Sequence, residues 1–202
     1  MSEVRSIDLA GPFDVYVTQE NDTRVSVEGD ENLLEYVETV RKGDVLQIAV
    51  RDGFHLKPRG KLKVFVSAPR LHEFDVSGTG RIFSALITAA DKVDLSVSGS
   101  GRIAFTAIDA PLVHSDISGS GSVECGGTTK TFKAEIAGSG NINAYDLLSE
   151  STAVHIAGSG NAEVFASKRL TVNIAGSGDV AYKGTPQVSQ SLAGSGKVRK
   201  RG

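Results

Sequence analysis

The chain has 202 residues, of which 40% are apolar and 23% charged, and its formal net charge is −2. This composition is typical of a globular protein and excludes an intrinsically disordered chain. The near-neutral charge favours neither nucleic acid nor an anionic membrane as a partner. The sequence contains no run of about 18 apolar residues, the length that a membrane-spanning helix needs. The single cysteine, Cys125, excludes an intramolecular disulfide and a cysteine-based metal site.

The first 70 residues contain segments in which apolar and polar side chains alternate, as they do in half-buried strands. These segments are 13–17, 24–27, 45–50 and 61–66. Between them, residues 30–43 predict one helix, with Asp30 as its N-cap and Gly43 at its C-cap position. Its apolar stripe consists of Leu33, Leu34, Val37 and Val40. Because the end of a stacked sheet exposes unpaired edges, we expect this helix to pack on or close the N-terminal part of the fold.

From residue 76 onward the chain repeats one short motif seven times. Each copy has an apolar residue, then Ser or Ala, and then Gly-Ser-Gly, or Gly-Thr-Gly in the first copy. The first glycines of the copies are residues 78, 99, 119, 138, 158, 176 and 194, so the period is 18 to 21 residues. A unit of this length cannot bury its apolar face alone and must stack on its neighbours.

Alternating residues on both sides of each Gly-x-Gly predict two strands per unit, followed by a looser link such as residues 145–150. No copy has a helical pattern, and a propeller blade needs about 40 residues or more. We therefore predict an all-β fold, a parallel β-helix with coils about 4.8 Å apart and Gly-x-Gly at one repeated corner. Its interior stack consists of Val97, Ile117, Ile136, Ile156 and Ile174.

The segments 13–17, 25–34 and 43–48, followed by the serial Gly-Ser-Gly motifs, resemble the bacterial GIN-domain family. That family is described as a putative auto-transporter adhesin head with no assigned function. The resemblance covers nearly the whole chain. It implies a right-handed parallel β-helix in an exported protein of the periplasm or cell surface, and it supplies no catalytic residues.

The first five residues contain no apolar signal segment. The sequence therefore fits either a cytoplasmic protein or a mature exported region from which the signal has been removed. The resemblance favours the exported region.

Stacking places equivalent positions of successive units side by side. At the position three residues before the first glycine of each copy, stacking brings Asp116, Glu135 and His155 onto consecutive coils, about 5 Å apart. Paired carboxylates can hydrolyse glycosides or bind a cation, but a solvated strand face is the simpler interpretation because few aromatic residues are near. We keep these three residues as a candidate surface column and predict no catalytic residue, no cofactor and no metal site.

Three other patterns have structural interpretations. The Gly-x-Gly motifs lack the third glycine and the following helix of a dinucleotide-binding motif. Asn141 and Asn161 predict an amide ladder between coils. The four histidines have spacings that bring no three of them together, which argues against zinc; they are His55, His72, His114 and His155.

We predict one β-helix domain over residues 1–202. It comprises irregular N-terminal coils with the capping helix in 1–70, the seven repeats in 71–198, and a basic tail in 199–202 that we interpret as a solvated terminus. The predicted function is a non-catalytic module of the cell envelope or surface that binds a glycan or an envelope protein, as an adhesin does. The alternatives are a self-assembling structural β-helix that forms homo-oligomers, and a carbohydrate-active β-helix enzyme.

Overall fold

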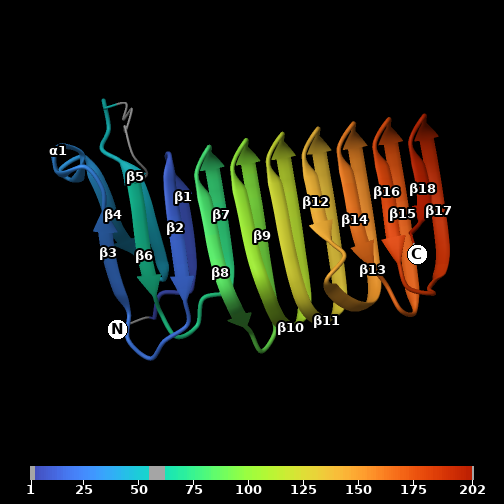
Figure 1. Cartoon of the computed structure of the whole chain (residues 1–202), viewed down its shortest axis with the longest axis horizontal. Helices are drawn as coiled ribbons and strands as arrows, with labels where there is room; N and C mark the ends of the chain where they lie inside the picture. The colour runs from blue at the N-terminus through green and yellow to red at the C-terminus, as the bar shows by residue number, and fades with distance from the viewer. Residues whose placement is uncertain (1–2, 55–61, 202) are drawn as a thin grey trace.

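The computed structural model describes residues 3–54 and 62–201. Strands stack side by side along the long axis of the molecule (Figure 1), forming a β-solenoid with one short helix. The predicted all-β parallel β-helix is therefore confirmed. No helix among these residues has the length and apolar character needed to cross a bilayer. His55, one of the four histidines considered above, lies outside the described residues.

Each turn contributes one strand to each of two parallel ladders, which the strands form by pairing with equivalent strands of the neighbouring turns. The first ladder runs in the order β5 (Val45–Val50), β1 (Ser6–Ala10), β7 (Glu73–Gly78), β9 (Lys92–Gly99), the second halves of β10 (Arg102–Gly119) and β11 (Ser122–Gly138), β13 (Leu147–Gly158), β15 (Arg169–Gly176) and β17 (Gln187–Gly194). The second ladder runs in the order β6 (Leu62–Ser67), β2 (Phe13–Thr18), β8 (Arg81–Thr88), the first halves of β10 and β11, β12 (Asn141–Ala144), β14 (Asn161–Phe165), β16 (Asp179–Lys183) and β18 (Lys197–Lys200).

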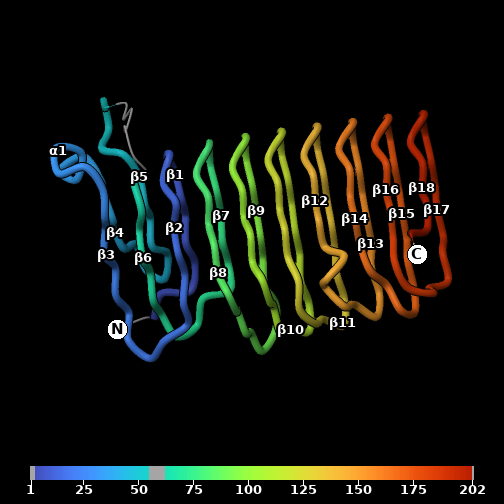
Figure 2. The backbone as a smooth tube through the Cα atoms, viewed as in Figure 1, coloured from blue at the N-terminus to red at the C-terminus, as the bar shows by residue number. Residues whose placement is uncertain are grey.

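The coils at the N-terminal end do not follow chain order. Strands β1 and β2 lie between the β5–β6 coil and the β7–β8 coil, so the chain begins inside the stack, runs outward and returns (Figure 2). Two antiparallel strands cover the N-terminal edge: β3 (Arg24–Glu28) pairs with β6, and β4 (Val37–Lys42) pairs with β5. Strands therefore close this edge, where the sequence predicted a helix.

The predicted helix over 30–43 is too long. Helix α1 spans only Glu31–Leu34, has no buried residue, and receives no capping hydrogen bond from the Asp30 side chain. Val37 and Val40 belong to β4, and Gly43 has a φ of 68° in the turn between β4 and β5. The β-branched residues of 37–40 favour a strand, and pairing with β5 satisfies the backbone groups that a longer helix would have bonded internally.

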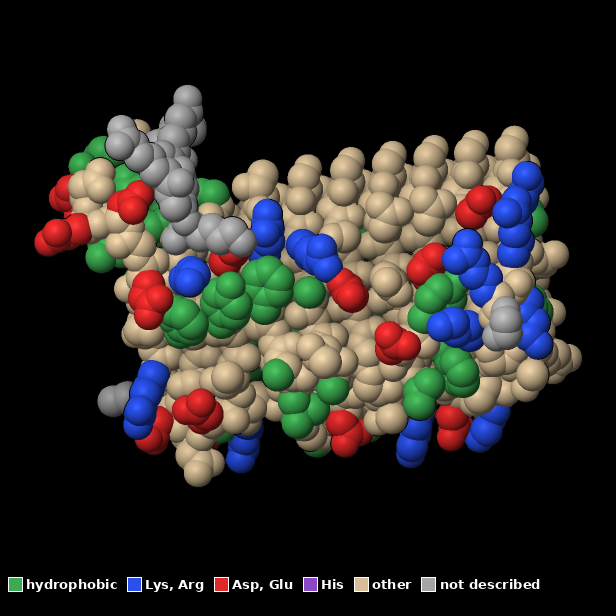
Figure 3. All heavy atoms as spheres, in the orientation of Figure 1, with side chains coloured by type: hydrophobic (Ala, Val, Ile, Leu, Met, Phe, Trp, Pro, Cys, Tyr) green, Lys and Arg blue, Asp and Glu red, His purple; other side chains and the backbone are tan. Residues whose placement is uncertain are grey.

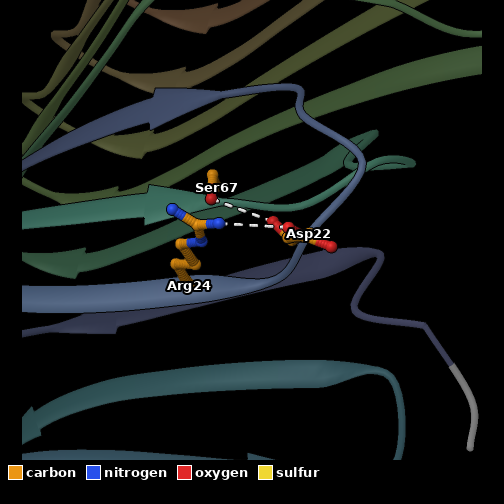
Figure 4. A network of polar contacts seen from close by, with 3 residues as sticks. All are labelled: Asp22, Arg24 and Ser67. Carbon is orange, nitrogen blue, oxygen red and sulfur yellow. Dashed lines mark hydrogen bonds and ion pairs between the residues drawn. The ribbon is translucent and has the colours of Figure 1, made fainter.

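A small polar network holds the turn before β3 (Figure 4). The Ser67 hydroxyl, at the end of β6, donates to the backbone carbonyl of Asp22 at 3.0 Å. Arg24 Nη2 lies 3.1 Å from Asp22 Oδ2. The hydroxyl contact comes from a side chain that is nearly buried, so it fixes the point at which β3 joins the edge of the second ladder.

The apolar interior is one continuous cluster of buried side chains that extends from Val4 to Val180. The predicted interior stack is confirmed, since Val97, Ile117, Ile136, Ile156 and Ile174 are all at most 3% exposed and pair in register from coil to coil. Cys125 is buried in the same interior, where desolvation raises the pKa of its thiol to about 12.

The two corners of each coil are built differently. At the Gly-x-Gly corner the backbone turns sharply, and Gly158 has a φ of 134°. At the opposite corner β10 and β11 run through as continuous bent strands. The predicted loose link over 145–150 is wrong for most of its length: only residues 145 and 146 separate β12 from β13, and Leu147 and Ser149 are buried.

The predicted amide ladder is present at the start of the second-ladder strands. Asn161 Nδ2 donates to Asn141 Oδ1 at 3.1 Å, the backbone N–H of Asp179 donates to Asn161 Oδ1 at 3.2 Å, and the backbone N–H of Lys197 donates to Asp179 Oδ1 at 2.9 Å. This chain of contacts ends in β18, which includes Arg199 and Lys200. Two residues that the sequence placed in a tail are therefore part of the last paired strand.

Candidate functional site

The candidate surface column lies on the outer side of the first ladder. Asp116 in β10, Glu135 in β11 and His155 in β13 occupy directly paired positions, and Asn173 in β15 follows. Strand alternation explains this position, because each of these residues immediately precedes a buried isoleucine that points into the interior. The register that the sequence predicted is thus present, and the side chains stand on consecutive coils.

A shallow groove of about 400 Å³ follows this column, and we call it the first-ladder groove. One side is formed by the polar column and the other by alanines from the repeated Ala-Gly-Ser-Gly motif, namely Ala137, Ala157, Ala175 and Ala193. The alanines are outward-facing and small, so the surface beside the polar column is low and nearly flat. A groove of this shape can accept an extended ligand along several coils.

Polar contacts link the column to its neighbours. Asn173 Nδ2 lies 3.4 Å from His155 Nδ1. On the adjoining column, His114 stands between two carboxylates, with Nδ1 3.5 Å from Asp94 Oδ1 and Nε2 3.6 Å from Glu135 Oε1. The groove itself presents the Asp116 and Glu135 carboxylates as hydrogen-bond acceptors and the Asn173 amide as a donor.

Carboxylates continue the polar column towards the N-terminal end. Asp8 in β1 pairs with Asp75 in β7, and Gln47 Nε2 donates to Asp8 Oδ2 at 3.0 Å. Burial raises the pKa of the Asp75 carboxyl, while a hydrogen bond from Ser96 opposes that shift and the neighbouring carboxylates reinforce it. Among the described residues, no group of three or more His, Cys, Asp and Glu side chains could hold a metal ion.

The sequence did not reveal a second surface feature, a stack of three aromatic rings on the outside of the second ladder. Tyr16 in β2 lies between Phe65 in β6 and Phe83 in β8, with ring centroids 5.3 Å apart on both sides and interplanar angles of 19° and 23°. Figure 3 shows a row of hydrophobic side chains over these N-terminal strands. The rings lie in the order Phe65, Tyr16, Phe83, which differs from their order in the chain, and this region has no Gly-Ser-Gly motif to align its strands. The alternation in 13–17 and 61–66 was therefore the only sequence signal for the ring stack.

The fold and these exposed faces define a β-solenoid whose outer surfaces are columns of equivalent side chains. The sequence profile described as "Putative auto-transporter adhesin, head GIN domain" matches residues 4–186. The chain belongs to this family, as its motifs indicated. A comparison with curated proteins found no match.

Several solved structures share the fold. A Bacteroides fragilis protein described as "a putative adhesin" is 22% identical with a TM-score of 0.90, over 99% of this chain and 93% of that one. A Parabacteroides distasonis protein described as a "Putative lipid binding protein" is 29% identical with a TM-score of 0.80, over 100% of this chain and 94% of that one. A Parabacteroides merdae protein described as "a putative adhesin" is 24% identical with a TM-score of 0.75, over 100% of this chain and 93% of that one.

Proposed function

We propose that this chain is a non-catalytic module of the cell envelope or cell surface that binds a glycan or an envelope protein along its outer faces. Membership in a family of adhesin heads supports the adhesin-like role and an exported location, in the periplasm or at the cell surface. The observation that carries the proposal is the first-ladder groove, which presents Asp116, Glu135, His155 and Asn173 on four consecutive coils.

The groove suits extended binding because its chemistry repeats at each coil. From Glu135 to Asn173 each coil adds one polar side chain and one alanine at the same spacing, so a linear ligand would meet a polar and an apolar contact at every coil. Each contact with an exposed side chain is weak, and affinity would come from several coils acting together. This arrangement favours a polymer or an extended segment over a small molecule.

Binding can be tested with immobilised polysaccharides and envelope proteins, using the double variant Glu135→Ala/His155→Ala. A matched control is Asn143→Ala/Glu163→Ala, which also removes one carboxylate but on the second ladder. We expect the groove variant to lose binding by tenfold or more and the control to retain it. Equal binding by both variants would place the interaction outside the groove.

The composition of the groove also argues for a non-catalytic role. A glycosidase holds its two carboxyl groups in a cleft that clamps and distorts the sugar, whereas the first-ladder groove is shallow and no aromatic side chain is among its lining residues. The test is an assay of acidic and neutral polysaccharides with the parent and Asp116→Ala/Glu135→Ala. We expect no turnover by either; turnover that disappears in the variant would establish the carbohydrate-active enzyme instead.

A second candidate function, self-assembly end to end, is favoured by opposite charge at the two ends of the solenoid. Residues 20–44, at the end formed by β3 and β4, contain eight acidic and three basic residues, and residues 183–201 contain five basic residues and no acidic one. Light scattering at about 50 mM and 500 mM salt would test it, since such contacts weaken with screening. Salt-sensitive oligomers that are lost in Lys197→Glu/Lys200→Glu would support this alternative.

A further inference from the structure

The ring stack on the second ladder ends at Phe83, and the next position along the ladder is open. The register pairs Phe83 in β8 with Ala104 in β10, and Ala104 with Glu124 in β11. One face of the Phe83 ring packs against Tyr16, and the paired position on its other side carries only the Ala104 methyl group. The fourth position of the stack therefore has no ring.

A hollow of about 470 Å³ lies at this position. We call it the ring slot, bounded by Phe83, Ala104, Glu124 and Thr106. Two coil spacings separate the Phe83 and Glu124 positions, about 10 Å in total. That distance accepts one six-membered ring at the usual separation of stacked rings, about 4.5–7 Å between centres, with the Glu124 carboxylate on its far side.

The rim of the slot is polar and charged on both sides of this apolar floor. Arg102, two residues before Ala104 on the same outward side of β10, forms an ion pair with Glu124. Arg81 lies beside it, with Nε 3.9 Å from Asp14 Oδ1. Thr106 stands two residues beyond Ala104 and adds a hydroxyl. The slot thus combines an aromatic wall with hydrogen-bond donors and acceptors around the edge.

We propose that the ring slot is a binding subsite for one hexopyranose ring of a neutral glycan. The apolar C–H face of the sugar would stack on Phe83 above Ala104, and its hydroxyls would exchange hydrogen bonds with Arg102, Glu124 and Thr106. Glu124 is the charged residue among those that line the slot, and Arg102 forms an ion pair with it, so the pair is neutral overall and favours a neutral ligand. A lipid chain or an apolar aromatic side chain could not replace the water that hydrates the Arg102–Glu124 pair and the Thr106 hydroxyl, whereas sugar hydroxyls could. This inference rests on the proposed glycan binding; it adds a second site, on the second ladder, to the first-ladder groove and names its ligand class.

The test uses Ala104→Phe, which fills the slot with a fourth ring. The matched control is Ala181→Phe, because Ala181 is half-buried at the equivalent position of β16 on the same ladder. The probes are gluco-, manno- and galacto-oligosaccharides of six units, measured by titration calorimetry. We expect Ala104→Phe, and also Phe83→Leu, to weaken binding of the preferred oligosaccharide by tenfold or more, and Ala181→Phe to bind as the parent does.

A second measurement locates the ligand without relying on variants. In protein labelled at alanine methyl groups, the NMR signal of Ala104 should shift on addition of the oligosaccharide, while that of Ala181 should not. A parent that binds an oligosaccharide with no shift at Ala104 and no loss in Ala104→Phe would overturn the subsite and leave the proposed function intact. A parent that binds none of the oligosaccharides would overturn both the subsite and the glycan ligand, and Ala104 shifts caused only by a tyrosine-containing peptide would assign the slot to a protein partner.

Discussion

The carboxylates at the N-terminal end of the first ladder show how one residue can carry an electrostatic cost. Burial raises the pKa of Asp75 above its usual 3.8, the Ser96 hydrogen bond opposes this, and Glu73, Asp8 and Asp94 add repulsion. When folding raises the pKa of a carboxyl group, protonation of that group favours the folded state. This stabilisation is complete below the pKa of the unfolded state and is lost as the pH rises through the pKa of the folded state. Ionised Asp75 therefore destabilises the fold at neutral pH.

We accordingly expect Asp75→Asn to raise the melting temperature at pH 7. The asparagine amide oxygen can still accept the Ser96 hydrogen bond, while the repulsion disappears, a gain of up to about 1 kcal/mol for like charges on paired strands. At about pH 3 the parent carboxyl is also neutral, so the two proteins should melt together. Circular dichroism melts at both pH values provide the measurement, and a lower melting temperature of the variant at pH 7 would contradict the prediction.

At the scale of structural elements, the Gly-x-Gly corner combines two separate constraints. Gly158 has a φ of 134°, and a Cβ built on it would lie 2.3 Å from the carbonyl oxygen of Gly138 on the preceding coil. Gly78 has a φ of 103°, but a Cβ there would meet no atom within 4 Å. Gly158 is therefore needed for both backbone conformation and coil-to-coil approach, and Gly78 for conformation alone.

Alanine substitution should separate these constraints. Gly78→Ala should destabilise by about 1–2 kcal/mol, the cost of a left-handed backbone for a residue with a Cβ, whereas Gly158→Ala should cost more than about 3 kcal/mol because the coils must also move apart. Urea unfolding of both variants and the parent measures the difference. Equal losses would mean that close approach between coils contributes little.

The interior stack allows a second prediction for an element. Ile136, 2% exposed, lies between Ile117 and Ile156. Ile136→Asp should destabilise by several kcal/mol because it buries an unpaired charge, and Ile136→Val should cost only about 0.5–1.5 kcal/mol through a small cavity. Thermal melting compares the two, and an unchanged melting temperature for Ile136→Asp would be incompatible with an inward-facing column.

For the whole molecule, the coil-by-coil construction predicts unequal local stability. Middle strands such as β10 and β11 pair on both sides, whereas every residue of β17 is exposed, including Val188 at 36% and Leu192 at 41%. In a solenoid each coil is stabilised mainly by its neighbours, so amide hydrogen exchange should be fastest in β17 and β18 and slowest in β10 and β11. Exchange measured by mass spectrometry tests this, and uniform protection would indicate a single cooperative unit.

Much of the fold and the candidate column could be predicted because the repeats align themselves. The Gly-x-Gly corner fixes one point of each coil, and strand alternation then decides which residues face inward, which explains why both Ile136 and the register of Glu135 were found. The helix over 30–43 was overestimated because spaced apolar residues such as Val37 and Val40 are compatible with a short helix or with a strand. Pairing with β5 decided between them.

The sequence by itself determined the solenoid, its period, its interior column and the polar column of Asp116, Glu135 and His155, since these follow from local alternation and a repeated corner. Only the tertiary structure decided the order of the N-terminal coils and their antiparallel edge strands. It also assembled the Phe65–Tyr16–Phe83 stack, whose rings come from strands that are not consecutive in the chain. The physical reason is that backbone pairing between strands depends on their positions in space, and without a repeated corner no local pattern encodes which strand lies beside which.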